Sequence, residues 1–268
     1  MEKLSHQSEL PLTGKNALVG GSSKGIGRAC AHELARLGAR VILVSRSSDL
    51  LQNVLNTLDR PVNQEHQYLV ANYDNPQGLV TKVQDILQLM AIHILINNTG
   101  GPASGKIVEA KADAFRNAFD RHLICNHLLT QAVLPGMQQA GYGRIINIIS
   151  TSVKQPLENL GVSNTIRGAV ANWAKTLASE VAAAGITVNN VLPGMTYTSR
   201  LEELINILAS QRGITAEEVE QTMIREIPTG RFGEPREIAA VVGFLASPAA
   251  SYVNGINLPV DGGRTKSL

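Results

Sequence analysis

Closely spaced glycines are the residues in this sequence whose chemistry is most specific. They stand at Gly21, Gly25 and Gly27, in the stretch Ala17–Gly27 that reads ALVGGSSKGIG. Backbone without a Cβ atom lets a pyrophosphate approach closely, and free N–H groups at a helix start attract its negative charge. An apolar run precedes these glycines, and apolar residues at helical spacing follow over Arg28–Leu37. This order of strand, glycine turn and helix predicts a dinucleotide-binding loop, because a plain tight turn would not need three glycines.

The end of the next apolar strand indicates which dinucleotide is bound. NAD sites usually place a carboxylate there, about 20 residues after the loop, to accept a hydrogen bond from the ribose 2′-hydroxyl. This chain has Val44-Ser45-Arg46 at that place. A guanidinium can bind a 2′-phosphate through two hydrogen bonds, and Lys24 in the loop adds a second positive charge. We therefore expect the protein to bind NADP(H) rather than NAD(H). The alternative is that Arg46 is only a solvated loop residue.

Composition and charge narrow the class of protein. The chain has 268 residues, 44% hydrophobic and 17% charged, with a net charge of +2. The positive charges are scattered, so nucleic-acid binding is not expected. No apolar run approaches the ~18 residues of a membrane span, and Met1–Glu9 lacks the apolar core of a signal peptide. The histidines are scattered without metal-ligand spacing.

The two cysteines, Cys30 and Cys125, lie in predicted helices. We expect them to be small buried side chains rather than a disulfide or redox pair. This cysteine usage and the absence of a signal peptide fit a cytoplasmic protein.

Apolar, β-branched runs alternate with helix-length amphipathic segments along the chain. Most of the runs are continuously apolar, which is typical of parallel strands covered on both faces. The sequence therefore predicts an α/β fold of Rossmann type, a doubly wound parallel seven-stranded sheet with helices on both faces, in one domain over residues 1–268. The expected strands are Asn16–Val19, Arg40–Ser45, Gln67–Val70, Ile92–Ile96, Arg144–Ile149, Thr187–Val191 and Asn257–Val260.

An insertion at about residues 198–230 interrupts this alternation. It contains two helical patterns, Leu201–Ser210 and Ala216–Ile224, and Thr215 with Glu218 forms a capping-box signature before the second. In a doubly wound sheet such an insertion overhangs the ligand crevice. We interpret it as a small helical lid over a fairly apolar substrate; the alternative is a surface excursion that packs against the core or a partner chain. Its apolar side consists of Leu201, Leu204, Ile205, Leu208, Val219 and Met223.

Further motifs follow the glycine loop in a fixed order. They read LINNTG at 95–100, GRIINIIS at 143–150, VNNVLPG at 188–194 and VDGG at 260–263. Together with the loop, they resemble the short-chain dehydrogenase/reductase family over residues 10–263, in the style of 3-oxoacyl-(acyl carrier protein) reductases. The resemblance implies reduction of a carbonyl group by hydride from a nicotinamide.

In that family, a tyrosine gives the proton, a lysine lowers the pKa of the tyrosine and holds the nicotinamide ribose, a serine binds the carbonyl oxygen and an asparagine supports a water relay. The resemblance places the serine at Ser150. It places Ser163 at the tyrosine position, Arg167 at the lysine position and His122 at the asparagine position. Only Ser150 keeps the residue type of the family, so the active site is atypical.

These replacements change the available acids. A serine hydroxyl is a far weaker acid than a phenol, and Arg167 keeps its charge but can still donate to ribose hydroxyls. His122, with an ordinary pKa near ~6.5, is a candidate substitute acid beside Ser150. The alternative is a helix histidine bound by Asp120 or a backbone carbonyl. Tyr197 is a candidate acid or, alternatively, an aromatic wall of the substrate pocket.

The resemblance also assigns the remaining cofactor contacts. It implies that Asn72, next to Tyr73, faces the adenine and that Thr198 contacts the nicotinamide carboxamide. The full expected cofactor set comprises Gly21, Ser23, Lys24, Gly25, Ile26, Gly27, Arg46, Asn72, Tyr73, Asn98, Gly100, Arg167, Pro193, Gly194 and Thr198.

The expected partners are a small carbonyl or acyl-thioester substrate and further copies of the chain. The resemblance suggests a homotetramer built partly through the predicted helix from Ser163 to Ala184 and the helix that holds His122. The leading hypothesis is an NADP(H)-dependent oxidoreductase with a non-standard proton donor. Its alternative is an NADP(H)-binding sensor or structural protein without turnover, because the usual proton donor is missing.

Overall fold

A parallel sheet of seven strands forms the centre of the molecule in the computed structural model, which describes residues 10–267. Its strand order is β3-β2-β1-β4-β5-β6-β7, and every neighbouring pair is parallel. The chain crosses from β3 at one edge to β4 beside β1, so the strand order reverses between β1 and β4. The strands are β1 Asn16–Gly20, β2 Arg40–Ser45, β3 Gln67–Val70, β4 Ile94–Asn97, β5 Gly143–Ile148, β6 Ile186–Pro193 and β7 Asn257–Val260.

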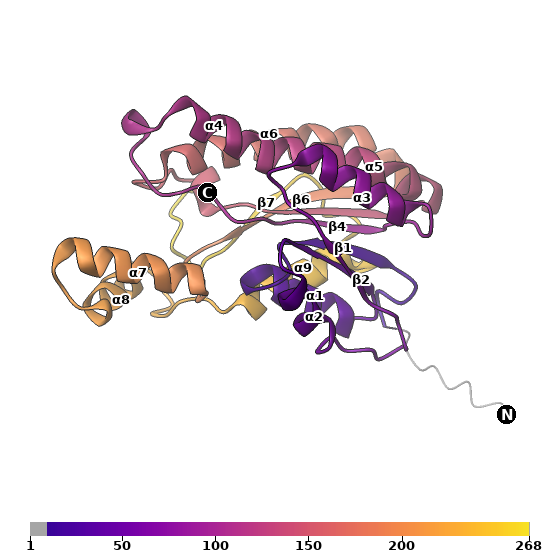
Figure 1. The fold of residues 1–268 in the computed structure, drawn as a ribbon, viewed down its shortest axis with the longest axis horizontal. Coiled ribbons are helices and arrows are strands. Elements are labelled where there is room, and N and C mark those ends of the chain that lie inside the picture. Colours follow the sequence, from indigo (N-terminus) through magenta and orange to yellow (C-terminus); the bar gives the residue numbers. More distant parts are fainter. Residues whose placement is uncertain (1–9, 268) are drawn as a thin grey trace.

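Helices cover both faces of this sheet. Helices α1, α2 and α9 lie on one face and α3, α5 and α6 on the other, while α7 and α8 extend beyond the body of the sheet (Figure 1). The helices are α1 Gly25–Arg36, α2 Ser48–Leu55, α3 Pro76–Leu87, α4 Ala112–Phe119, α5 Cys125–Ala140, α6 Gly161–Val181, α7 Ser199–Arg212, α8 Ala216–Arg225 and α9 Pro235–Ala246.

Two buried apolar clusters bind the helix layers to the sheet. One joins β-strand residues such as Val19 and Val41 to α1 and α9, and the other joins Leu18 and Ile42 to α3, α5 and α6. Neighbouring residues on one strand therefore enter opposite clusters, as the period of a strand dictates. This explains the continuously apolar runs and confirms the predicted fold class.

The predicted strands are all present, with shifts at their ends. The fourth begins at Ile94 instead of Ile92, and the sixth extends to Pro193 instead of Val191. The two helices of the 198–230 insertion are also present, and Thr215 and Glu218 form the expected capping box.

Other predictions concern the cysteines, the membrane and the N-terminus. Cys30 and Cys125 are buried free thiols, and burial raises the pKa of each to about 12. No helix within residues 10–267 is long and apolar enough to cross a membrane. The expectation for Met1–Glu9 lies outside the described residues.

The apolar side chains of the insertion pack against one another. Leu201, Ile205 and Val219 are buried in a cluster between α7 and α8, and Leu204, Leu208 and Met223 pack against it. The prediction that this side faces an apolar substrate therefore loses its basis, because these side chains are used to hold the two helices together.

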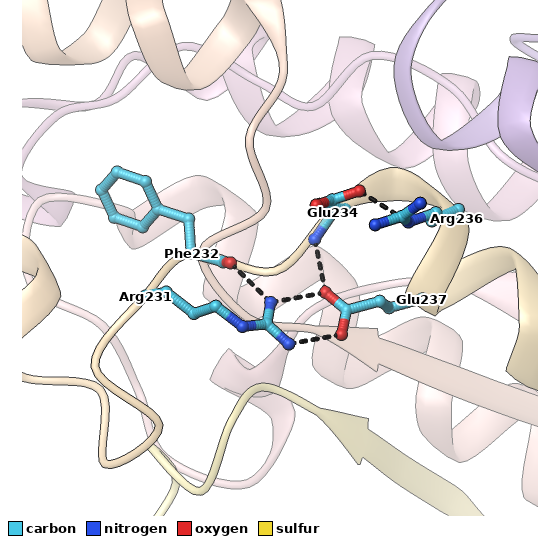
Figure 2. Close-up of polar contacts among 5 residues, drawn as sticks. All are labelled: Arg231, Phe232, Glu234, Arg236 and Glu237. Atoms are coloured by element: carbon cyan, nitrogen blue, oxygen red, sulfur yellow. Dashed lines mark hydrogen bonds and ion pairs between the residues drawn. The ribbon is translucent and has the colours of Figure 1, made fainter.

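The two ends of the insertion are fastened to each other. A parallel bridge joins Thr196 to Gly233, and Arg231 binds Glu237 through two hydrogen bonds of 2.7 Å. Glu237 also accepts from the backbone N–H of Glu234 at 2.8 Å, as Figure 2 shows. The segment that enters the insertion and the segment that leaves it are therefore held side by side before the start of α9.

Four asparagines form a hydrogen-bonded row across the carboxyl half of the sheet. Asn97, Asn147, Asn190 and Asn257 stand directly opposite one another in register on β4, β5, β6 and β7. Each amide nitrogen donates to the next oxygen, at 2.9 Å from Asn97 to Asn147, 2.8 Å from Asn147 to Asn190 and 2.8 Å from Asn190 to Asn257. The row gives a partner to most of these buried amide groups, while Asn97 Oδ1 has none.

We predict that Asn147→Ala destabilises the protein by about 2–6 kcal/mol, because two buried amides lose a partner at roughly 1–3 kcal/mol each. Chemical denaturation measures this loss. Asn53→Ala on the exposed face of α2 is the control and should change stability by under about 0.5 kcal/mol. A loss below about 1 kcal/mol for Asn147→Ala contradicts the structural role of the row.

Candidate active site

The glycine loop connects β1 to α1 beside the point where the strand order reverses. Gly21 and Gly25 have φ angles of +57° and +56°, in the region that favours glycine. A Cβ atom on Gly27 would lie 2.3 Å from the carbonyl oxygen of Gly21 and 2.6 Å from Asn98 Nδ2. Asn98 Nδ2 in turn donates to the Gly20 carbonyl at 3.0 Å. The loop is thus folded tightly against the end of β4.

The first turn of α1 leaves its backbone donors available. Lys24 occupies the N-cap position, its side chain makes no capping hydrogen bond, and the first turn contains no acidic residue. N–H groups in this arrangement suit a negatively charged ligand. The predicted loop residues Ser23, Gly25 and Ile26 lie around this turn, so the site fits the pyrophosphate of a dinucleotide.

Tyr73 has a supporting position beneath the loop. A Cβ atom on Gly20 would lie 2.3 Å from Tyr73 Oη and 2.6 Å from the Asn98 carbonyl oxygen. The Tyr73 ring is buried in the core with Leu18, and burial raises the pKa of its hydroxyl. The side chain therefore fills the space that a larger residue at Gly20 would need, and an adenine contact by Tyr73 stays a prediction.

The predicted 2′-phosphate site is open and positively charged. Arg46 follows β2, is exposed and forms no ion pair with any carboxylate among residues 10–267; Lys24 is exposed as well. Asn72 is exposed after β3, and its side chain accepts from the Asp74 backbone at 3.1 Å. These residues fit a phosphorylated ribose next to an adenine.

The predicted nicotinamide end is brought to the loop by the start of the insertion. Thr198 caps α7 and lies 3.4 Å from the place of a Cβ atom on Gly25. Gly194 donates to the Val260 carbonyl at 2.9 Å, which fixes the chain after Pro193 beside β7. Gly100 has open space around it. The structure thus places Thr198 against the glycine loop, as a shared cofactor site requires.

A cleft of about 570 Å³ borders this part of the loop. Its wall is formed by α1, the start of α7 and the start of α9, and includes Lys24, Gly25, Tyr197 and Thr198. Asn98 and Ser150 are not part of it. The cleft therefore borders the glycine loop and Thr198 but does not reach Ser150.

Ser150 and the residues of α6 meet at the end of β5. Ser150 Oγ accepts from the Ser152 backbone at 3.1 Å and caps a short 3-10 turn. Arg167 Nη1 donates to the Ile148 carbonyl at 2.9 Å, which ties α6 to β5 next to Ser150. Ser163 lies one helical turn before Arg167 on α6, and both are buried. The structure thus gathers these three predicted positions.

His122 reaches the same place from a π-helical segment, Asp120–Ile124, between α4 and α5. Its side chain is 2% exposed, and its Nε2 atom has no hydrogen-bond partner. Burial, followed by the charges of Arg167, Arg121 and Arg200, lowers the pKa of His122 to about 2. A histidine with this pKa is neutral at pH 7, which disfavours the predicted role as an acid. The alternative, a helix histidine bound by Asp120 or a backbone carbonyl, stays a prediction.

Arg200 is a residue of this site that sequence reasoning missed. It lies in the first turn of α7, and its Nη2 donates to the Pro102 carbonyl at 3.1 Å. A Cβ atom on Gly101 would lie 2.4 Å from Arg200 Nη1, so the guanidinium rests on the backbone after β4. The signal in the sequence was an arginine two residues after Thr198, at the base of the insertion.

Tyr197 is a poor candidate for the missing acid. Tyr197 is 49% exposed, and the nearby carboxylate of Glu202 raises the pKa of its hydroxyl. The ring stacks on Phe232 with centroids 6.4 Å apart. The alternative role, an aromatic wall of the substrate pocket, stays a prediction for Tyr197.

Within residues 10–267, no group of three or more His, Cys, Asp or Glu side chains is placed to hold a metal ion.

Comparisons with known proteins agree with this geometry. The model of a family described as enoyl-(acyl carrier protein) reductase matches residues 21–265. A 3-oxoacyl-(acyl-carrier-protein) reductase of Pseudomonas aeruginosa is 36% identical over 257 residues, or 95% of this chain and 98% of that protein. A tropinone reductase homologue of Arabidopsis thaliana is 32% identical over 94% of this chain and 76% of that protein.

A solved structure is similar over nearly the whole chain. L-sorbose reductase from Gluconobacter frateurii, in complex with NADPH and L-sorbose, has a TM-score of 0.90 and 30% sequence identity. The match covers 97% of this chain and all of that chain (100%). The names of these relatives share reduction and differ in the substrate.

We predict that Gly27→Ala weakens binding of NADPH at least about tenfold, because its Cβ atom would collide with the Gly21 backbone and displace the loop. NADPH fluorescence measures the dissociation constant. Gly168→Ala in α6 is the matched control, since a Cβ atom there meets nothing within 4 Å and alanine favours a helix. Unchanged binding by Gly27→Ala contradicts the assignment of the loop.

We predict that His122 makes the protein less stable in mild acid. Its folded-state pKa of about 2 lies below the ordinary value of 6.5, so the stability it contributes is present above pH 6.5 and is lost as the pH falls below it. Between pH 7 and pH 5 the loss amounts to about 2 kcal/mol.

Denaturation of the native protein and of His122→Asn at both pH values isolates this part, because every other titrating group is common to the two proteins. The native protein should lose about 2 kcal/mol more than the variant. Equal losses would show that His122 titrates near its ordinary pKa.

Proposed function

Because the chain belongs to the short-chain dehydrogenase/reductase family, we propose that it is an NADP(H)-dependent oxidoreductase that interconverts a carbonyl and an alcohol group of a small molecule. The observation that carries the proposal is the tight glycine loop, whose free N–H groups lie between exposed Arg46 on one side and Ser150 on the other. Those features provide a phosphate site, a 2′-phosphate site and a carbonyl site along one edge of the sheet.

The preference for NADP(H) rests on charge at the end of β2. Arg46 and Lys24 are both exposed, and Ser45 and Ser47 flank Arg46 where a carboxylate would be needed to bind an unmodified ribose. A guanidinium gains a charge-assisted pair with a phosphate. NADP(H) is therefore the cofactor that this chain fits better.

The residues of the catalytic end have separate roles in this proposal. NADP(H), when bound, supplies or accepts the hydride. Ser150 donates a hydrogen bond to the carbonyl oxygen, and Arg167 stabilises the negative charge that develops there. Burial, followed by the charge of Arg200, lowers the pKa of Arg167 to about 10, which leaves the guanidinium charged at neutral pH.

The proton donor is then non-standard. With its pKa at about 2, His122 is neutral at pH 7 and offers an N–H hydrogen bond without acting as an acid. Ser163 is too weak an acid to replace a phenol, but its hydroxyl can hydrogen-bond a water molecule that delivers the proton. In this proposal the charge of Arg167 first stabilises the negative carbonyl oxygen of the substrate, and a water molecule then protonates that oxygen.

The rival function is a nucleotide sensor without turnover. The relatives bear the names of reductases, which favours an enzyme. We further propose a cytoplasmic homotetramer assembled partly through α6 and the helices around His122, with an acyl thioester or another carbonyl compound as substrate.

We predict steady oxidation of NADPH when the protein is given acetoacetyl thioesters or small ketones. The same samples should quench or shift NADPH fluorescence. Arg46→Glu should raise the dissociation constant of NADPH roughly 10–100-fold and that of NADH much less, because only NADPH carries the 2′-phosphate.

Arg60→Glu is the control for this change, since Arg60 is exposed and outside the site. Binding without oxidation of NADPH by any carbonyl compound would favour the sensor. Equal affinity of the native protein for NADPH and NADH would contradict the role of Arg46.

A further inference from the structure

The catalytic end of the site holds more positive charge than its own carboxylates balance. Arg121 is paired with Asp74 at 2.7 Å, but Arg167 and Arg200 form no ion pair with any carboxylate in residues 10–267. Glu203 acts on Arg200 through its charge without bonding it. Two arginines at this end of the sheet, Arg167, which is buried, and Arg200, which is exposed, thus have no carboxylate as counter-ion.

The unpaired charge of Arg167 is buried. The residue is 8% exposed, its Nη1 donates to the neutral carbonyl of Ile148, and its Nε has no partner. A buried charge without a counter-ion is costly, whereas the same charge next to an anion is strongly favoured. The arrangement is therefore incomplete without a negatively charged group.

Arg200 completes this cationic wall from the other side. It comes from α7, crosses to the backbone after β4 and rests on Gly101, with Nη2 on the Pro102 carbonyl. Only part of its fork is used by that single bond, so the remaining N–H groups are available to a ligand. Arg200 contacts the backbone after β4 and Arg167 contacts the end of β5, and these two strands are neighbours in the sheet. The charge of Arg200 also lowers the pKa values of Arg167 and His122.

His122 adds a neutral donor or acceptor to the same wall. Its Nε2 atom is buried and has no partner, although the residue is 2% exposed. Two buried polar atoms, His122 Nε2 and Arg167 Nε, thus lack partners, and they belong to two segments that are packed together. Such coincident vacancies are typical of a site that a polar ligand satisfies.

The phosphates of the proposed cofactor do not account for this charge. They have their own donors, the first turn of α1 for the pyrophosphate and Arg46 with Lys24 for the 2′-phosphate. The nicotinamide ribose next to Arg167 would be neutral. A counter-ion for Arg167 and Arg200 would therefore come from another molecule.

We propose that the substrate is a carbonyl compound bearing a carboxylate, which Arg200 binds through its guanidinium fork while Arg167 stays at the carbonyl oxygen. This inference rests on the proposed function, because it names the substrate class of that same site. A planar carboxylate matches the fork of an arginine and forms two parallel charge-assisted hydrogen bonds with it. The apolar side chains of the insertion pack between α7 and α8, so they do not form an apolar surface against a charged substrate.

The experiment compares keto acids with their neutral methyl esters. Pyruvate, 2-oxobutanoate, acetoacetate and levulinate are each paired with the ester, and ligand-observed NMR measures their dissociation constants with and without NADP⁺. The acids should bind the native protein at least about tenfold more tightly than the esters, the factor that one charge-assisted pair supplies.

Variants of Arg200 locate the effect. Arg200→Gln should make acids and esters bind equally, and Arg200→Lys should keep part of the preference because it retains the charge without the fork. Arg212→Gln, at the opposite end of the same helix, is the matched control and should behave as the native protein. Circular dichroism and NADPH fluorescence show whether each variant is folded.

Three results would overturn the inference. They are equal binding of acids and esters by the native protein, an unchanged acid preference in Arg200→Gln, and weaker NADPH binding by that variant with the preference intact, which would assign Arg200 to the cofactor. A failure of the native protein to bind NADPH refutes the proposed function instead, and the acid preference is still measured without nucleotide.

Discussion

The close approach of Gly21, Gly27 and Asn98 is the contact on which the rest of the site depends. Backbone oxygen, backbone carbon and the Asn98 amide occupy the space where side chains would stand, so the loop can fold only with glycine at these places. Asn98 then links the loop to the end of β4 through the Gly20 carbonyl. The strand that carries the loop and the strand that ends beside the catalytic residues are thereby held at one spacing.

The sheet beneath this contact is unusually polar at its carboxyl half. The row of asparagines from Asn97 to Asn257 joins four strands through side-chain amides as well as backbone hydrogen bonds. A buried amide has two donors and an acceptor to satisfy, so a shift of register by one residue would leave several of them without partners. The row therefore specifies how β4 to β7 align, and it fixes the level at which Ser150 emerges from β5.

Above that sheet, the end of the site around Ser150 carries fixed positive charge. The family resemblance predicts that Ser163 and Arg167 stand at its tyrosine and lysine positions, and the charges of Arg167, Arg121 and Arg200 act on His122. Burial and these charges disfavour an imidazolium, so the histidine cannot serve as the acid that its residue type suggests. What this end of the site offers is stabilisation of negative charge, either on a carbonyl oxygen or on a carboxylate of the substrate.

The sequence by itself determined the fold class, the seven strands and the glycine loop. These depend on short-range rules, namely the period of apolar residues and the conformations open to glycine. The family resemblance also located Ser150, Ser163 and Arg167, which lie at or against the end of β5, and His122 on the segment before α5; their catalytic roles stay predictions. The sequence did not predict the close approach of the Tyr73 hydroxyl to Gly20, because the two residues are far apart along the chain.

Only the tertiary structure decided the electrostatics and the use of the insertion. Arg200 is remote in sequence from Arg167 and His122, and the pKa of His122 follows from how these residues pack together and exclude water. Likewise, the apolar residues of the insertion have the same spacing whether they face a ligand or each other, and packing of α7 on α8 settled that question. Residue type and spacing give the groups that a site can use; distance and burial, which arise from packing, set their charge.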